Sequence, residues 1–141
     1  MTDLVVDASA AAHLALLPTQ PPGLKQYRCV APPLMWSEAL SALLEGAYRG
    51  DIPAGALEGA LERLEALDVA LEEVDADHRR RTLHLARSLG WAKSYDAEYV
   101  TLAQVLACPL LTLDARLSRG VGHLIEVMSP ARLMARPGNF R

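Results

Sequence analysis

The chain has 141 residues, of which 51% are hydrophobic and 22% charged, and its formal net charge is −3. This length suits one domain with its own core, and the negative balance argues against a protein that coats nucleic acid without specificity. No apolar run reaches membrane-spanning length and no leader precedes the first strand, so we expect a cytoplasmic protein with no membrane partner.

Strands and helices alternate along the first half of the chain. Residues 4–6 form a short apolar run that leads straight into an alanine-rich helix over residues 8–17, and residues 29–31 predict a second strand. Helices are then expected over residues 33–48 and 57–67. The first of these carries an apolar stripe at helical spacing: Trp36, Leu40, Leu43, Leu44 and Ala47.

The second half continues the alternation and ends in a polar segment. We expect a strand over residues 69–74, a helix over 75–89 that begins at Asp75, a helix over 94–107, a strand over 110–113, a short helix over 115–119 and a strand over 124–127. This alternation predicts an α/β fold in which a mostly parallel sheet is covered on both faces. We assign residues 1–129 to one domain and residues 130–141 to a loosely ordered tail.

The two cysteines give no sign of a metal site. Cys29 and Cys108 lie in or beside apolar segments and lack metal-ligand spacing. We therefore expect buried free thiols rather than a disulfide.

Two acids follow directly after predicted strands. Asp7 ends the strand at residues 4–6, and Asp114 ends the strand at residues 110–113. Ligands of open α/β sheets bind outside the carboxyl ends of the strands, which is where both side chains would lie. Asp before a helix is also a good N-cap, so each residue alone is explained as well by capping as by function. A carboxylate has two oxygens, and the two roles are compatible.

Two further acids lie on predicted helices. Asp96 falls among the apolar positions of the helix over residues 94–107, where a carboxylate is costly unless something pairs with it. Pairing with an arginine or a helix N-terminus would also explain it. Glu38 shares a face with Ser41, Glu45 and Arg49, and this pattern alone indicates a solvated helix face.

Taken together, the four acids predict a site for a hard cation. Mg²⁺ takes oxygen ligands at about 2.0–2.1 Å, and carboxylates crowded together without a cation would repel one another. A metal-activated water could then attack a phosphodiester. Ser9 and Thr112 each lie two residues from an acid and could orient Asp7 and Asp114, although both hydroxyls also suit a helix start and a strand.

The basic residues concentrate between positions 78 and 119: His78, Arg79, Arg80, Arg81, Arg87, Lys93, Arg116 and Arg119. Three consecutive arginines on a helix cannot share one face, so most of these side chains are expected to be solvated. Lys93 and Arg116 each lie within three residues of a proposed metal ligand, which makes them candidates for contact with the phosphates of a nucleic acid.

Four segments together resemble a PIN domain, and most closely the VapC-type toxins of bacterial toxin–antitoxin pairs. They are Leu4-Val5-Val6-Asp7-Ala8-Ser9-Ala10, Trp36-Ser37-Glu38-Ala39-Leu40, Ser94-Tyr95-Asp96-Ala97-Glu98-Tyr99-Val100-Thr101-Leu102-Ala103 and Leu111-Thr112-Leu113-Asp114. The resemblance spans residues 4 to about 127. The segment around Asp96 is quite specific to this family, whereas the first segment alone is only weak evidence for the resemblance.

The resemblance implies a metal-dependent endoribonuclease in a three-layer α/β/α fold. Residues 1–129 would form a PIN-like nuclease domain around a five-stranded sheet of order 3-2-1-4-5, and the acids that hold the metal would be Asp7, Glu38, Asp96 and Asp114. Many relatives carry a further acid shortly after the Asp114 position, where this chain has Arg116, Leu117, Ser118 and Arg119. We therefore expect one Mg²⁺ or Mn²⁺ ion and leave a second open. The resemblance also implies an RNA substrate, a homodimer and a small antitoxin partner.

Two other functions remain as alternatives. One is a non-catalytic PIN-like module that binds RNA or a partner protein, although a pure scaffold has no reason to keep four costly acids. The other is an α/β phosphohydrolase with an Asp nucleophile, whose most familiar motif would need an acid at Ser9. A specific thermal shift with Mg²⁺ or Mn²⁺ would favour the nuclease over the binding module.

Overall fold

The computed structural model describes residues 1–134 and contains one parallel sheet of five strands. The strands are β1 (Thr2–Val6), β2 (Tyr27–Ala31), β3 (Ala70–Leu71), β4 (Leu110–Leu111) and β5 (Val127–Met128). Their order is β3-β2-β1-β4-β5, which confirms the order that the resemblance implied. The outer strands are shorter than expected, and β5 begins at Val127, where the predicted strand ended.

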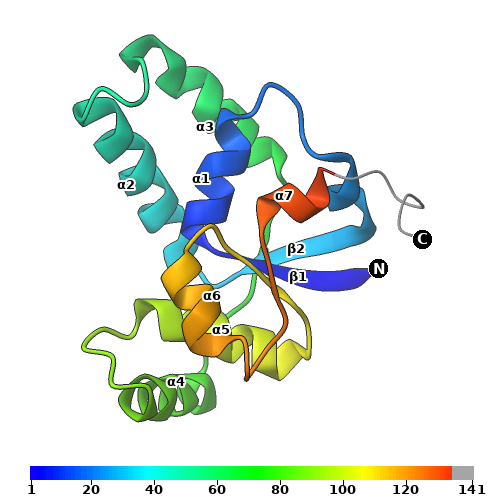
Figure 1. Cartoon of the computed structure of the whole chain (residues 1–141), viewed down its shortest axis with the longest axis vertical. Coiled ribbons are helices and arrows are strands. Elements are labelled where there is room, and N and C mark those ends of the chain that lie inside the picture. The colour runs from blue at the N-terminus through cyan, green and yellow to red at the C-terminus, as the bar shows by residue number, and fades with distance from the viewer. Residues whose placement is uncertain (135–141) are drawn as a thin grey trace.

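Helices cover both faces of the sheet (Figure 1). They are α1 (Ala8–Leu16), α2 (Leu34–Tyr48), α3 (Leu57–Ala66), α4 (Ala76–Ser88), α5 (Tyr95–Leu106), α6 (Ala115–Val121) and α7 (Pro130–Leu133), with 3₁₀ turns η1 (Pro22–Gln26) and η2 (Ala54–Ala56). The first three helices pack together on one side, and α5 lies against β1 with α4 outside it. The three-layer α/β/α architecture is thus confirmed. Among residues 1–134, no helix is long and apolar enough to span a bilayer.

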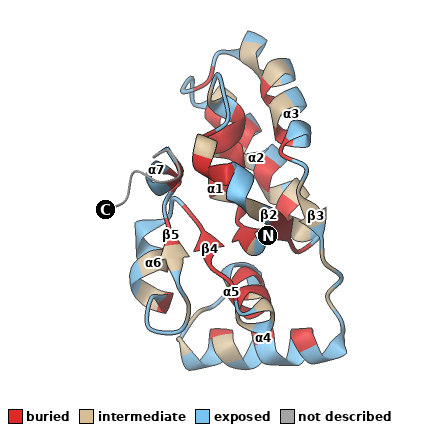
Figure 2. Ribbon diagram, turned by 90° about the vertical axis from the view of Figure 1, so that its right-hand side faces the viewer, coloured by how far each residue is buried: buried red, intermediate tan, exposed pale blue. Residues whose placement is uncertain are grey.

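The core lies between these layers. Figure 2 shows burial concentrated in β1, β2, β4 and α1, whereas α4 is largely exposed. The apolar side chains of β1 and β4 are fully buried, as expected for central parallel strands: Leu4, Val5, Val6, Leu110 and Leu111. Both cysteines are buried free thiols, as expected.

The buried face of α2 differs from the predicted stripe. The residues buried on this helix are Met35, Ala39, Leu43 and Gly46. Of the predicted stripe only Leu43 is fully buried, and Leu44 is 61% exposed. The cause is close packing by small residues. A Cβ at Gly46 would lie 2.5 Å from Ile52 Cδ1, so a larger residue there would force the Ile52 side chain to move.

Part of the expected tail is folded. Pro130–Leu133 forms helix α7, which packs on η1, and both Pro130 and Leu133 are buried. Gly23 makes this contact possible, because a Cβ there would lie 2.8 Å from the carbonyl oxygen of Leu133. The prediction of a loose tail is therefore wrong for residues 130–134, and residues 135–141 lie outside the described residues.

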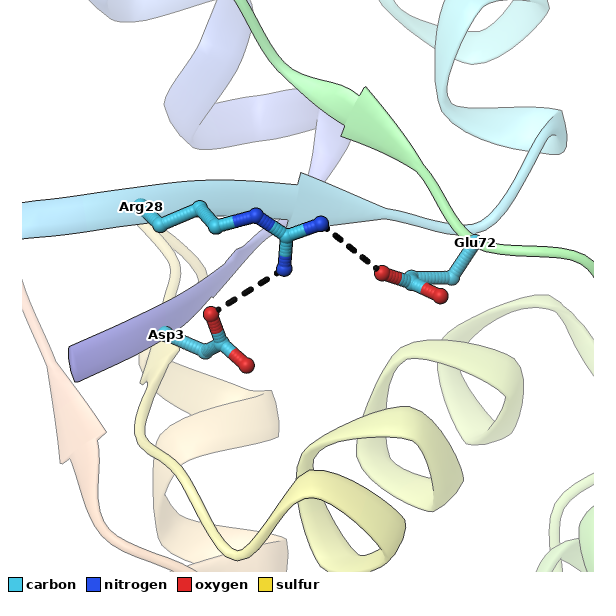
Figure 3. A network of polar contacts seen from close by, with 3 residues as sticks. All are labelled: Asp3, Arg28 and Glu72. Carbon is cyan, nitrogen blue, oxygen red and sulfur yellow. Dashed lines mark hydrogen bonds and ion pairs between the residues drawn. The ribbon is translucent and has the colours of Figure 1, made fainter. Parts of the chain in front are cut away.

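One arginine links three neighbouring strands at the surface (Figure 3). Arg28 on β2 lies beside Asp3 of β1 in register, and their side chains are 3.2 Å apart. Its second terminal nitrogen lies 3.3 Å from Glu72, the residue after β3. Arg28 is half exposed, and exposed ion pairs contribute little to stability. The network therefore contributes more to the alignment of the three strands than to the free energy of unfolding.

The C-terminus of α5 offers a test of backbone strain. Ala107 caps this helix in the left-handed region, at φ 50° and ψ 49°, where a Cβ is unfavourable. Replacing Ala107 with glycine is expected to stabilise the protein by about 1 kcal/mol, measured by urea unfolding. The matched change Ala42→Gly inside α2 should destabilise it by about 1 kcal/mol. A loss of stability at position 107 would contradict the strain argument.

Candidate active site

Two acids lie side by side at the carboxyl ends of the central strands. Asp7 directly follows β1, and Asp114 lies three residues after β4. The two strands are neighbours, with Val6 opposite Leu111. The sheet order therefore places these acids at its topological switch point, where α/β proteins bind ligands.

Hydroxyl groups join the two strand ends. Ser9 Oγ donates to Asp7 Oδ1 at 2.7 Å and accepts from the Leu113 backbone N–H at 3.1 Å. Thr112 Oγ1 accepts from the Asp114 N–H at 3.0 Å and lies 3.4 Å from Ser9 Oγ. Ser9 and Thr112 thus form hydrogen bonds with the backbone or carboxylate of both acids, and their supporting role in the site stays a prediction.

Both acids are also helix caps. Asp7 Oδ1 accepts from the Ala10 N–H at 2.9 Å, at the start of α1. Asp114 Oδ1 accepts from the N–H groups of Arg116 and Leu117 at 2.9 and 3.2 Å, at the start of α6. These bonds all go to Oδ1, so they do not engage Oδ2. Capping fixes each carboxylate in place and leaves its second oxygen for another partner.

Glu38 reaches the site from α2. It is half-buried rather than solvated, and Tyr99 Oη donates to Glu38 Oε1 at 2.7 Å. Tyr99 itself is a buried residue of α5, so its hydroxyl needs a partner. The expectation of a solvated face is wrong for Glu38. Its partner Tyr99 was missed, although a tyrosine on a buried helix face is a signal that some polar group lies nearby.

Asp96 lies in the first turn of α5, where most of the residue is exposed and only its carboxyl is partly buried. The argument from periodicity placed it on an apolar face, whereas the residue is exposed and lines a cavity. The buried positions of α5 surround most of the helix: Ala97, Tyr99, Val100, Thr101, Leu102 and Ala103. Because α5 is buried on several sides, its periodicity could not define one face.

A cavity of about 530 Å³ brings most of the predicted residues together. Three acids line it, Glu38, Asp96 and Asp114, and so do both predicted cations, Lys93 and Arg116. Asp7 is buried beside them, with 5% of its surface exposed. The remaining lining includes residues that sequence reasoning did not select: Trp91, Tyr95 and Leu117.

The acids influence one another's protonation. Burial raises the pKa of Asp7, hydrogen bonds from Thr112, Ala10 and Ser9 oppose this, and the charge of Asp96 adds to it. Burial also raises the pKa of Glu38. The hydrogen bond from Tyr99 lowers this pKa, and the charges of Asp96 and Asp7 raise it further.

The pKa of Asp96 is raised in the same way. Partial burial of its carboxyl is the larger cause and the charge of Asp114 is the smaller. The four carboxylates therefore form one cluster of like charges, which is unfavourable unless a cation or protons neutralise it.

The donor set fits a hard cation, but the ligands are not preassembled. Within residues 1–134, no three His, Cys, Asp or Glu side chains are grouped closely enough to hold a metal ion as they stand. All four clustered groups are nevertheless carboxylates, the ligands that Mg²⁺ and Mn²⁺ prefer. Burial raises the pKa values of Asp7, Glu38 and Asp96, and neighbouring carboxylates add a smaller contribution. The chemistry of the cluster therefore fits a divalent ion after small side-chain movements.

Residues 4–121 match the PIN domain family. No curated protein matches the sequence. Among solved structures, PAE2754 from Pyrobaculum aerophilum is 23% identical with a TM-score of 0.73, over 94% of this chain and 87% of that one. VapBC-5 from Mycobacterium tuberculosis is a member of the VapBC family of toxin-antitoxin systems. It is 22% identical with a TM-score of 0.54, and the match covers 92% of this chain and 98% of that one.

A third similar structure is a PilT N-terminus domain protein, SSO1118, from Sulfolobus solfataricus P2. It is 15% identical with a TM-score of 0.50, over 94% of this chain and 91% of that one. At these levels of identity the three structures show a shared fold.

Proposed function

The chain belongs to the PIN domain family, and from this premise we propose that it is a metal-dependent endoribonuclease acting as the toxin of a toxin–antitoxin pair. The observation that carries the proposal is the meeting of four acids at the carboxyl edge of the sheet. Asp7 and Asp114 come from strand ends, and Glu38 and Asp96 from two helices. Such a costly cluster has a physical reason if it binds a cation.

The four carboxylates would hold one Mg²⁺ or Mn²⁺ ion. When bound, the ion supplies Lewis-acid activation of water and neutralises charge at the phosphodiester. The protein's part is orientation. The caps fix one oxygen of Asp7 and of Asp114, and the Tyr99 hydroxyl fixes one oxygen of Glu38. No acid occupies residues 115–119, so a second ion would lack the extra carboxylate that many relatives have there.

Two cations complete the site. Lys93 and Arg116 line the same cavity as three of the acids, where they would bind phosphates on either side of the bond that is cut. Arg116 also lies at the N-terminus of α6, whose dipole favours an anion. Binding through such contacts would weaken steeply as the salt concentration rises.

The toxin assignment brings further proposals about partners. We propose a homodimer in the cytoplasm that a small antitoxin inhibits. These rest on family membership and on the likeness in fold to VapBC-5. Leu40, Leu44 and Tyr48 on α2 are exposed and could contribute to a protein interface.

Production of the chain without an antitoxin is expected to arrest bacterial growth, and the Asp7→Ala variant should not do so. The readouts are culture density and cleavage of cellular RNA. Asp75→Ala is the matched control. Asp75 caps α4 through a 2.8 Å bond from the His78 N–H, so this change also costs about 1 kcal/mol in capping but lies outside the acidic cluster. Equal toxicity of wild type and Asp7→Ala would contradict the proposed nuclease site.

A further inference from the structure

A second cavity adjoins the acidic one and has no role in the proposed cleavage step. It encloses about 560 Å³ between the start of α2, the segment before α4, α4 itself and the start of α5. Its lining consists of Pro33, Leu34, Val74, Arg79, Thr82, Leu83, Ser94 and Glu98. A volume of this size is typical of sites for small ligands, which are mostly apolar with a few polar groups.

The two cavities lie on either side of the same pair of helix ends. On α2, Leu34 lines the second cavity, and Glu38, about one turn later, lines the first. On α5, Tyr95 and Asp96 line the first cavity, whereas Glu98 lines the second. A strand of RNA with a phosphate at the acids would therefore bring a neighbouring nucleotide to the second cavity.

Apolar side chains form much of its wall. Leu34, Val74 and Leu83 contribute this surface, and Leu83 is 64% exposed. Arg79 is held at the rim, where its Nη1 donates to the Val74 carbonyl at 2.7 Å. The Thr82 hydroxyl already donates to Thr101 Oγ1 at 3.1 Å. The wall thus offers a surface for a flat, weakly polar group.

Glu98 is the strongest hydrogen-bond acceptor of this cavity. Its side chain is half-buried and lines the cavity. Within residues 1–134 Glu98 forms no ion pair, even though Arg79 lines the same cavity. Its place in the first turn of α5 is favourable for an acid, but this does not provide a partner for the side chain.

We propose that the second cavity binds a nucleobase next to the cleaved phosphate, and that Glu98 selects guanine there by accepting two N–H bonds. This inference rests on the proposed ribonuclease function. Specific recognition of single-stranded RNA depends on splayed bases that are stacked or packed and read along their edges. The apolar wall would contact the faces of the base, and Glu98 its edge.

The charge of Glu98 favours a base over a phosphate. An ionised carboxylate repels a phosphate group because both are negatively charged. Guanine presents two adjacent donors, N1–H and the N2 amino group, which match the two acceptor oxygens of a carboxylate. Adenine and cytosine each have a ring nitrogen acceptor beside their amino group. A carboxylate can therefore accept only one hydrogen bond from that edge of the base, and its second oxygen is repelled by the ring nitrogen.

The test measures binding of short oligouridylates that carry one guanosine, inosine or adenosine. The protein is the full chain with Asp96→Asn, which should prevent cleavage, in the presence of Mg²⁺. A good pair between a side chain and a base edge contributes about 1–3 kcal/mol, so guanosine should bind about fivefold to 150-fold tighter than adenosine, with inosine between them. Fluorescence anisotropy gives the dissociation constants.

Substitutions then assign the preference to this cavity. Glu98→Gln should remove most of the guanosine preference, and Leu83→Ser should weaken binding of the substituted oligonucleotides. Glu62→Gln is the matched control, because Glu62 is an exposed helical acid on α3 and lines neither cavity.

The outcomes separate this inference from the proposed function. A chain that cuts RNA but binds guanosine, inosine and adenosine equally well has no guanine subsite, and a protein segment would become the better occupant of the apolar wall. A preference that survives Glu98→Gln would also overturn the assignment. A chain that neither binds nor cuts any oligonucleotide would overturn both proposals.

Discussion

Replacing Asp96 with asparagine is expected to reduce Mg²⁺-dependent RNA cleavage by about a thousandfold or more while leaving the fold intact. A metal ion contributes several kcal/mol of transition-state stabilisation, and each 1.36 kcal/mol is a tenfold change in rate. Asparagine has the same size but lacks the charge that would hold the ion. Because Asp96 is exposed and caps no helix, the change should not disturb packing.

Stability should respond in the opposite direction to activity. Without metal, Asp96→Asn removes one charge from a cluster of like charges, so the free energy of unfolding should stay constant or rise, within about 1 kcal/mol. Asp77→Asn is the matched control, an exposed acid in the first turn of α4 outside the cluster. If Asp96→Asn cuts RNA at the wild-type rate, Asp96 does not belong to the catalytic site.

Mg²⁺ or Mn²⁺ is expected to stabilise the wild-type protein and not Asp96→Asn. An ion at about 100 times its dissociation constant would add about 2.7 kcal/mol. For a chain of this length that corresponds to roughly 10 °C in Tm. Thermal unfolding with and without the ion measures the shift. A similar shift in Asp96→Asn would mean that the ion binds elsewhere.

The same cluster predicts a dependence on pH. A carboxyl whose pKa is raised on folding binds more protons in the folded protein than in the unfolded one, at pH values between its ordinary and its raised pKa. The pKa values of Asp7, Glu38 and Asp96 are all raised. Their contribution to the free energy of unfolding therefore falls as the pH rises from about 4, and the loss is complete above the raised values.

The wild type and Asp96→Asn should consequently diverge with pH when no metal is present. At low pH the cluster is protonated and the two proteins should have similar Tm values. At neutral pH the wild type should be the less stable of the two, and adding Mg²⁺ should reverse this order because the ion favours ionised carboxylates. A difference in Tm that does not change with pH would show that the acids do not interact.

The central part of the site could be predicted because it depends on local signals. Asp7 and Asp114 each follow a short apolar run and precede a helix, and parallel strands place their carboxyl ends at one edge. Their position at the edge of the sheet is what the structure shows, and their role as metal ligands stays a prediction. The pairing of β1 with β4 came from the resemblance, because periodicity does not encode strand order.

The helices that complete the site were harder to predict. On α2, packing selected Ala39 and Gly46 over Leu40 and Leu44, since small residues allow a close approach that hydrophobicity does not report. The rotation of this helix decides where Glu38 points. Its position therefore could not follow from pattern alone. Asp96 was singled out for a buried environment that it does not have, although it does line the cavity.

The bond between Ser9 and Leu113 has a consequence for synthesis of the protein. It joins residues 104 positions apart, so the acidic cluster cannot form until the segments around both Ser9 and Leu113 have been made. A nascent or truncated chain that stops before Leu110 lacks both strand β4 and Asp114. Contacts so distant in sequence form late in folding. If the protein has the proposed ribonuclease activity, a ribosome would not meet the complete site until the segment through Asp114 has been made.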